Sequence, residues 1–309
     1  MYKKPANIFQ LSYLLSGAER GKFAVGAFNP RYTAMIRPVL RGGELMQSPI
    51  IIQIAQVELE IYQLSVTHFA EQFWQAVADE KPTVPMGLHL DHTKKLTLIE
   101  EAISCGFTSV MIDASAKELQ DNIATTREVV SYAHARGVSV EAELGRIAAG
   151  DSIETENDDE LFTDPMEAGE FVRKTGVDAL AVSIGTAHGA YLVKKPRIDL
   201  DRLKAIRQQT QVHLVLHGGS GTPSEMIKAA IQSPGGGVSK INIATDLEVA
   251  LYSELKRDTR LSETEMNSMD QLEVDRGAQA VQKVVESKIT DFLISKGRAF
   301  EYQSQLIRK

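Results

Sequence analysis

Cysteine is almost absent from this chain of 309 residues, and its one cysteine, Cys105, excludes an internal disulfide. Acidic residues outnumber basic ones, and the formal net charge of −7 argues against a surface that binds nucleic acid or an anionic membrane. No apolar run approaches the roughly 18 residues that a membrane span requires. The first residues lack the apolar stretch and the cleavage site of a signal peptide. We therefore expect a soluble cytoplasmic protein with neither nucleic acid nor a membrane as a partner.

Hydrophobic residues make up 43% of the chain, which is enough for one large α/β barrel or for two ordinary domains. Eight short apolar runs are typical of buried strands, and segments with apolar residues every three to four positions alternate with them. The expected strands are residues 23–28, 50–55, 84–90, 109–113, 139–144, 179–184, 212–216 and 240–243. The expected helices are residues 32–46, 64–78, 96–105, 118–135, 165–175, 200–208 and 224–231. This alternation favours a TIM (β/α)8 barrel, with a doubly wound open sheet as the alternative.

Polar residues at the C-terminal ends of the expected strands favour the barrel. They are Asn29, Gln53, Asp91, His92, Asp113, Glu143, His188, His217 and Asn242. A barrel brings all eight strand ends to one mouth, whereas an open sheet would leave half of them at its edges. We therefore predict a single barrel domain over residues 1–309, with extra C-terminal helices from about residue 251 that cover the barrel or a partner subunit.

A metal site is predicted where three histidines follow different strands. His92, His188 and His217 come after the third, sixth and seventh expected strands. Neutral imidazoles are common zinc ligands, and three of them with one open position describe a catalytic zinc site. The pattern therefore predicts zinc at the barrel mouth.

Three carboxylates accompany these histidines. Asp91 directly precedes His92, which suits a general acid or base beside the metal, and a helix cap is the alternative. Asp113 and Glu143 would orient the metal ligands, offer a second metal position or form buried salt bridges. His89 lies two residues before Asp91, where packing in the core or support of a ligand is the better interpretation.

Two neighbouring loops predict phosphate binding. Gly218-Gly219-Ser220-Gly221 follows the seventh strand, and Asn242-Ile243-Ala244-Thr245-Asp246 ends the eighth, where the free N–H groups of a new helix favour an anion. The loops after strands 7 and 8 form the usual phosphate site of this barrel. Together with a metal and an acid/base carboxylate, the pocket indicates aldol or isomerase chemistry on a metal-polarised carbonyl.

Six motifs in this order resemble those of a known enzyme family. They are Leu88-His89-Leu90-Asp91-His92, Ser109-Val110-Met111-Ile112-Asp113, Val140-Glu141-Ala142-Glu143-Leu144-Gly145, Ile184-Gly185-Thr186-Ala187-His188-Gly189, Leu216-His217-Gly218-Gly219-Ser220-Gly221 and Lys240-Ile241-Asn242-Ile243-Ala244-Thr245-Asp246. Over about residues 5–300 the chain resembles the class II (zinc-dependent) ketose-bisphosphate aldolases of the tagatose- and fructose-bisphosphate type. The resemblance implies a cytoplasmic lyase of carbohydrate metabolism and glycolysis, a homodimer or homotetramer, which releases dihydroxyacetone phosphate and an aldehyde from a phosphorylated ketose.

The resemblance also implies roles for individual residues. The implied zinc ligands are His92, His188 and His217, and the implied second metal position is near Asp113 and Glu143. Asp91 would transfer a proton on the oxygen that becomes the aldehyde, and Asn242 would contact the dihydroxyacetone phosphate half. The residues implied around the phosphate are Gly189, Gly218, Gly219, Ser220, Ala244 and Thr245. A Na⁺ or K⁺ ion would lie nearby, and the Ala244-Thr245 pair is more similar to the tagatose type.

Four segments depart from the family pattern. They are Asn29-Pro30-Arg31-Tyr32 in place of Asn-Ile-Asn-Asn, Ala55-Gln56-Val57 in place of a small hydroxyl residue and a glycine, Ser115-Ala116 in place of serine-histidine, and Ala148-Ala149-Gly150-Asp151 in place of Gly-Gly-x-Glu. The last lies in an acidic stretch, residues 146–161, that is either a lid over the mouth or a solvated loop. Asp151 acts as the base that moves the C–H proton, or Glu154 does so from a rebuilt loop, or the substrate differs.

These departures leave two functional hypotheses open. The first is an active aldolase, and the second is an altered barrel that binds metal and sugar phosphate without turnover. A Schiff-base aldolase is disfavoured because the fifth to seventh expected strands contain no lysine. Arg276 in the C-terminal helices is a candidate ligand for a second phosphate, across a dimer interface as in relatives, and a surface helix arginine is the alternative.

Overall fold

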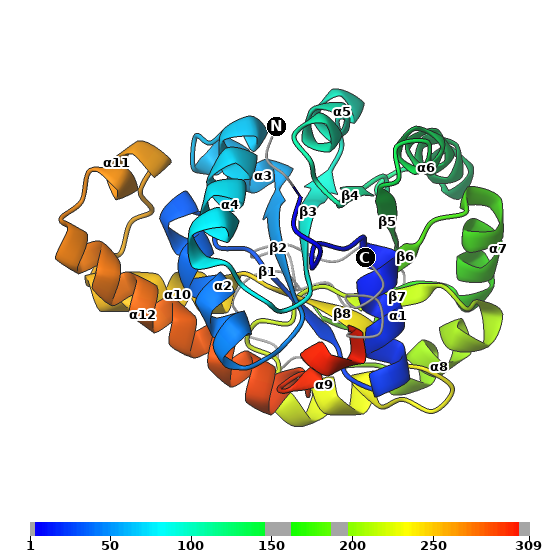
Figure 1. Ribbon diagram of the computed structural model, residues 1–309. Coiled ribbons are helices and arrows are strands. Elements are labelled where there is room, and N and C mark those ends of the chain that lie inside the picture. Colours follow the sequence, from blue (N-terminus) through cyan, green and yellow to red (C-terminus); the bar gives the residue numbers. More distant parts are fainter. Residues whose placement is uncertain (1–3, 146–161, 187–196, 303–309) are drawn as a thin grey trace.

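The computed structural model describes residues 4–145, 162–186 and 197–302. Its eight strands form a closed barrel in the order β1 to β8, and every neighbouring pair is parallel. The strands are β1 Val25–Phe28, β2 Ile50–Ala55, β3 Met86–Thr93, β4 Ser109–Ile112, β5 Ser139–Leu144, β6 Ala179–Val182, β7 His213–Leu216 and β8 Val238–Ile243. The predicted TIM barrel with C-terminal helices is therefore confirmed (Figure 1).

The described helices form the outer layer around this barrel (Figure 1). They are α1 Leu11–Gly21, α2 Ile36–Leu45, α3 Gln56–Ile61, α4 Val66–Glu80, α5 Leu96–Ser104, α6 Leu119–His134, α7 Pro165–Thr175, α8 Leu200–Gln209, α9 Ser224–Ile231, α10 Thr245–Leu255, α11 Glu263–Asn267 and α12 Gln271–Ser287. Short 3₁₀ segments cover Thr33–Met35 and Arg298–Tyr302, and a π-helical turn covers Lys288–Phe292. None of the helices in the described ranges has the length and apolar character that crossing a bilayer would demand.

The strands are buried on both faces, as parallel strands covered by helices must be. One hydrophobic cluster lies between the strands and the outer helices. A smaller cluster fills the barrel interior with residues such as Ala27, Met111 and Ala181, which alternate along their strands with outward-facing neighbours. The barrel is thus a packed core, and chemistry is confined to its ends.

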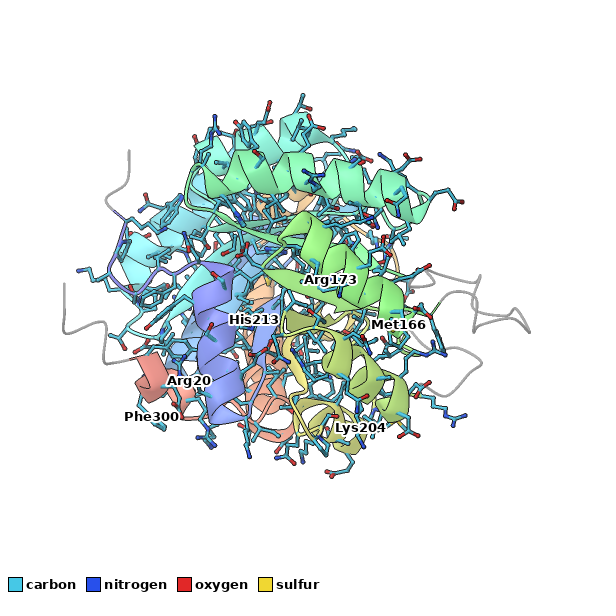
Figure 2. All side chains as sticks on the ribbon, turned by 90° about the vertical axis from the view of Figure 1, so that its right-hand side faces the viewer. Arg20, Met166, Arg173, Lys204, His213 and Phe300 are labelled. Atoms are coloured by element: carbon cyan, nitrogen blue, oxygen red, sulfur yellow. The ribbon has the colours of Figure 1, made fainter. Side chains whose placement is uncertain are left out.

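α1 closes the N-terminal end of the barrel, and the expected helices did not include it. Its Leu14 and Leu15 belong to the same cluster as the barrel interior. Figure 2 shows α1 beside His213 at the start of β7, whose Nδ1 lies 2.8 Å from Oε1 of Glu19. With one end closed by this helix, the opposite end, where the strands terminate, is left for the site.

Several element boundaries differ from those that the sequence predicts. β3 continues to Thr93, so Asp91 and His92 lie within the strand and not after it. α3 is an additional helix directly after β2, and its third residue, Glu58, caps its N-terminus by accepting a hydrogen bond from the backbone N–H of Ala55. Residue 251, the predicted start of the helical extension, lies inside α10, and α12 packs against both α10 and α2.

Candidate active site

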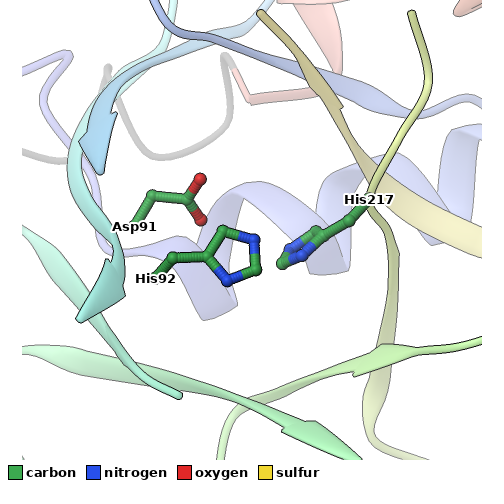
Figure 3. A group of neighbouring side chains, drawn as sticks. All are labelled: Asp91, His92 and His217. Atoms are coloured by element: carbon green, nitrogen blue, oxygen red, sulfur yellow. The ribbon is translucent and has the colours of Figure 1, made fainter. Parts of the chain in front are cut away.

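Asp91, His92 and His217 meet at the C-terminal end of the barrel (Figure 3). Each offers one potential metal-ligand atom, and these atoms all lie within 4.8 Å of one another. The rings of His92 and His217 have centroids 4.5 Å apart and an interplanar angle of 69°. Two of the three predicted zinc ligands are thus brought together with the predicted proton-transfer residue.

A β-bulge explains how two consecutive residues reach one site. In a regular strand, Asp91 and His92 would point to opposite faces. The pairing of β3 with β4 shifts register between Leu90 and Thr93, and His92 has a φ of 37°, which is rare for a residue with a side chain. Bulges re-aim side chains in this way next to active sites. The local backbone is therefore built to present Asp91 and His92 together.

The carboxylate of Asp91 is buried and held by two amides. Gln53 Nε2 donates to its Oδ2 at 3.2 Å, and Asn242 Nδ2 lies 3.1 Å from Oδ2 and 3.3 Å from Oδ1. Burial alone would raise the pKa of Asp91, but the nearby charges of His92 and Lys240 outweigh burial and hold it well below its usual value. The carboxylate is therefore ionised at neutral pH.

His92 is oriented by a second carboxylate. Its Nδ1 lies 3.1 Å from Oδ2 of Asp113, and Asp113 in turn accepts a hydrogen bond of 2.7 Å from the hydroxyl of Ser115. Burial would lower the pKa of His92, but Asp91 and Asp113 raise it to about 10. The surroundings therefore favour a positive charge at this imidazole.

This charge balance fits a bound divalent metal. A metal ligand must be a neutral imidazole, so a cation bound there replaces the proton that the site would otherwise hold. Imidazoles with carboxylates close by form a donor set that zinc accepts. Asp113 has the place of a carboxylate that orients a metal-binding histidine.

The ring of His217 lies between two carboxylates of β5. Its Nε2 is 2.9 Å from Oε1 of Glu141, and its Nδ1 is 3.2 Å from Oε2 of Glu143. Burial and the charge of His92 lower the pKa of His217, but these carboxylates raise it above the ordinary value. Glu143 also approaches His92, at 3.9 Å from Nδ1, so its carboxylate lies near both histidines.

Glu141 and Lys240 are buried site residues to which the sequence analysis assigns no role. Lys240 Nζ lies 2.8 Å from Oε2 of Glu141, and neither residue has exposed surface. Burial would raise the pKa of Glu141, but Lys240 and His217 lower it to about 2. The sequence could have indicated both residues, because side chains two positions apart in a strand lie on the same face. Glu141 shares a face with Glu143, and Lys240 shares one with Asn242.

The predicted phosphate loops lie side by side. The backbone N–H of Gly219 donates to the carbonyl of Asn242 at 3.3 Å, and the hydroxyl of Ser220 accepts from the N–H of Asp246 at 3.2 Å. Thr245 is the first residue of α10 and Ala244 precedes it, so the N-terminus of this helix lies beside Ser220. A helix N-terminus next to a glycine turn is suited to binding a phosphate.

Two of the four departures from the family pattern are joined to each other. Arg31, after β1, has its Nε 3.0 Å from Oε1 of Glu58, after β2, and it also forms an ion pair with Glu248 of α10. Asn29 Nδ2 donates to Oε2 of Glu58 at 2.8 Å. Ala55 ends β2 in a buried position. These residues form a linked polar cluster on the β1 and β2 side of the mouth.

The remaining predicted residues lie elsewhere. Arg276 is 53% exposed on α12, with Glu254 and Glu273 each 3.8 Å away, so within one subunit it belongs to the outer helical layer. Ala116 is exposed in the turn after β4. Four of the predicted site residues, Asp151, Glu154, His188 and Gly189, lie outside the described ranges.

Comparisons with known proteins agree with this arrangement. Residues 10–298 match the family model described as fructose-bisphosphate aldolase class-II. The chain is 35% identical to a fructose-bisphosphate aldolase of Giardia intestinalis, covering 94% of this chain and 92% of the relative. It is 35% identical to one of Geobacillus stearothermophilus, covering 93% and 97%. Among solved structures, the YdjI aldolase of Escherichia coli K12 superposes with a TM-score of 0.80 at 31% identity, covering 94% of this chain and 99% of that one.

Proposed function

We propose a zinc cofactor and a ketose 1-phosphate or 1,6-bisphosphate substrate for this chain, because it belongs to the class II fructose-bisphosphate aldolase family and is therefore a lyase that carries out aldol cleavage of a ketose bisphosphate. The reaction is the zinc-dependent cleavage of a ketose 1-phosphate or 1,6-bisphosphate into dihydroxyacetone phosphate and an aldehyde, together with the reverse condensation. The observation that supports it best is the meeting of Asp91, His92 and His217 at the mouth that also holds the two phosphate loops.

His92, His217 and His188 would hold the zinc ion, and the first two lie in the described group. The chemistry that zinc supplies when bound is Lewis-acid polarisation of a carbonyl group. Asp113 and Glu143 approach the two described histidines and support their orientation. A Na⁺ or K⁺ ion near the phosphate is a further part of the proposal.

The chain's own residues bind and orient the substrate. The N–H groups that open α10, together with the loop of Ser220, bind the phosphate of the dihydroxyacetone half. Asp91 takes the proton from the hydroxyl oxygen that becomes the aldehyde and returns it in condensation. Gln53 and Asn242 hold its carboxylate in place for both directions.

Four features of the proposal concern the rest of the substrate and the assembly. Asp151 or Glu154 moves the C–H proton. The Ala244-Thr245 pair favours a substrate of the tagatose type. Arg276 binds the distal phosphate of a substrate held by a neighbouring subunit of a homodimer or homotetramer. Analytical ultracentrifugation tests the assembly, and the KM of Arg276→Ala for a bisphosphate tests the role of Arg276. The location is cytoplasmic, which cell fractionation tests.

A retro-aldol screen over phosphorylated ketoses that differ at C4 and C6, with zinc present, tests the proposed reaction. We expect release of dihydroxyacetone phosphate from at least one of them, loss of activity on chelation and recovery when zinc is added. Chelated protein that is free of zinc by elemental analysis and keeps full activity would contradict the zinc dependence.

The linked cluster of Arg31, Glu58 and Glu248 motivates a second candidate function. It occupies a side of the mouth where the sequence departs from the family, and in this alternative the altered barrel would bind metal and sugar phosphate without turnover. Wild-type protein that binds zinc and dihydroxyacetone phosphate but cleaves none of the screened ketoses would favour this function over the first.

A further inference from the structure

A lysine and a glutamate form an ion pair in the interior of the barrel. Lys240 belongs to β8 and Glu141 to β5, strands that are not neighbours in the barrel, and the pair spans its interior with 2.8 Å between Nζ and Oε2. Neither residue has exposed surface. Desolvating two charges is costly, and well-packed apolar residues often replace such a pair without loss of stability. Stability alone therefore does not account for the pair.

The second oxygen of Glu141 indicates what the pair does. Oε1 lies 2.9 Å from Nε2 of His217, so the carboxylate accepts the proton of that nitrogen while its other oxygen faces Lys240. An imidazole that carries its proton on Nε2 has its lone pair on Nδ1. Nδ1 lies on the opposite side of the ring, 3.2 Å from Glu143.

Without a further constraint, the ring of His217 could be held in two ways. Glu141 and Glu143 lie on opposite sides of it, and either carboxylate can accept its N–H. Lys240 distinguishes the two sides, because its ion pair holds the Glu141 carboxylate in one place as an acceptor, whereas no lysine or arginine pairs with Glu143 among the described residues. With Glu141 held at Nε2, Nδ1 is directed toward Glu143, whose carboxylate also approaches His92.

We propose that Lys240 and Glu141 are positioning residues that fix the ring orientation and tautomer of His217 for metal binding. This inference rests on the proposed zinc-dependent function. It assigns a role to the buried lysine of β8, which touches neither the metal group nor the phosphate loops through any described contact. Apart from the charge effect of Lys240 on Asp91, the ion pair acts on the metal site through the imidazole of His217.

Zinc affinity, measured by competition with a chromophoric chelator, tests the inference in the full-length protein. We expect Glu141→Gln and Lys240→Met each to weaken zinc binding about 10- to 100-fold, the usual effect of removing a group that orients a metal-bound histidine. In the cobalt-substituted protein, the visible absorption bands of Co²⁺ should shift or weaken in the same variants. Neither readout depends on turnover.

The double variant Glu141→Gln/Lys240→Met separates positioning from simple stability. It leaves no unpaired buried charge, so we expect its thermal midpoint to recover toward wild type while its zinc affinity stays low. Arg207→Met is the matched control: Arg207 is buried and donates to the carbonyls of Gly236 and Val212, at the opposite end of the barrel strands. This control should lose stability and keep its zinc affinity within about twofold of wild type.

Wild-type zinc affinity in Glu141→Gln, or recovery of both stability and zinc affinity in the double variant, would overturn the inference. Both outcomes leave the proposed aldolase reaction standing. Wild-type protein that binds zinc but cleaves no ketose phosphate overturns the proposed function alone, and the comparison of zinc affinities still decides the role of the pair. Wild-type protein that binds neither zinc nor Co²⁺ overturns both.

Discussion

Asp91 and His92 are consecutive residues of β3, yet both side chains reach one group of potential ligand atoms within 4.8 Å of each other. The register shift against β4 and the positive φ of His92 make this possible. The backbone therefore brings the proposed proton-transfer carboxylate and a proposed metal ligand close together. A strained residue of this kind persists where the surrounding structure enforces it.

Replacement of Asp91 by asparagine should remove turnover and leave the metal in place. The amide has nearly the same shape but cannot accept the substrate proton, so we expect kcat to fall about 10²- to 10⁴-fold. Steady-state kinetics with zinc analysis of the same samples measures this, and Asp201→Asn on the exposed face of α8 is the control. If Asp91→Asn loses its zinc, Asp91 is a metal ligand and not the proton-transfer group.

Replacement of Gly219 by alanine should weaken phosphate binding. A Cβ at this position would lie 2.6 Å from Cγ2 of Ile241 and 2.9 Å from the carbonyl oxygen of Asn242, so one of the two loops must move. We expect a destabilisation of about 1–3 kcal/mol and a rise in the KM for the phosphorylated substrate. Gly176→Ala, strained by a φ of 70° but with open space around it, lies at the end of α7 and should lower stability without changing KM. An unchanged KM in Gly219→Ala would remove this loop from the phosphate site.

The sequence predicts the barrel and most of the site, because both depend on local patterns. Apolar runs and polar strand ends suffice to place His92, His217 and Ser220 at one mouth. The bulge that aligns Asp91 with His92 is harder to predict from the sequence, because it arises from the pairing of two strands. α3 is missing from the prediction since its N-terminus is capped by Glu58 and not by a serine, threonine or aspartate.

The pairing of Glu141 with Lys240 shows a second limit of prediction from the sequence. Each lies on the inward face of its strand by simple alternation, but nothing local specifies which inward charge meets which across a barrel. Only the closed topology brings β5 and β8 to the same interior. Long-range electrostatic partners are therefore the part of the site that the linear pattern leaves open.

His89 should make the protein less stable in mild acid. Burial and the charge of Lys240 lower its pKa from 6.5 to about 3, so the folded state keeps this imidazole neutral. Between about pH 6.5 and pH 3 the unfolded chain binds a proton that the fold does not, and stability falls as pH falls, by up to about 1.4 kcal/mol per pH unit. In His89→Asn, an amide can keep the hydrogen bond to Ser109 without this titration.

Chemical denaturation of both proteins at several pH values in matched buffers measures the effect. The difference in unfolding free energy between wild type and His89→Asn should be constant above about pH 6.5 and should shift against wild type below it. Contributions from the other titrating groups are common to both proteins and largely cancel. A difference that does not depend on pH would mean that His89 is protonated in the fold.

Glu58→Gln should lower both stability and turnover, although Glu58 touches no metal ligand among the described contacts. Its carboxylate accepts from Asn29 and the backbone of Ala55 and pairs with Arg31. An amide has one acceptor oxygen and no charge, so buried donors lose partners, at a cost of about 1–3 kcal/mol. The effect reaches the carboxylate of Asp91, the proposed proton-transfer group, through two amides. Asn29 Oδ1 accepts from Gln53 at 2.7 Å, and Gln53 donates to Asp91 at 3.2 Å.

The matched control is Glu60→Gln on the same short helix, where the side chain is exposed and contacts Gln56 and Lys95. A surface pair of this kind contributes little, so this variant should stay within about 0.5 kcal/mol of wild type and keep its kcat. Denaturant unfolding and steady-state kinetics on the best substrate of the ketose screen provide both readouts. If Glu58→Gln loses stability but retains kcat, the amides hold Asp91 without Glu58, and the linked cluster serves only to join the loops after β1 and β2.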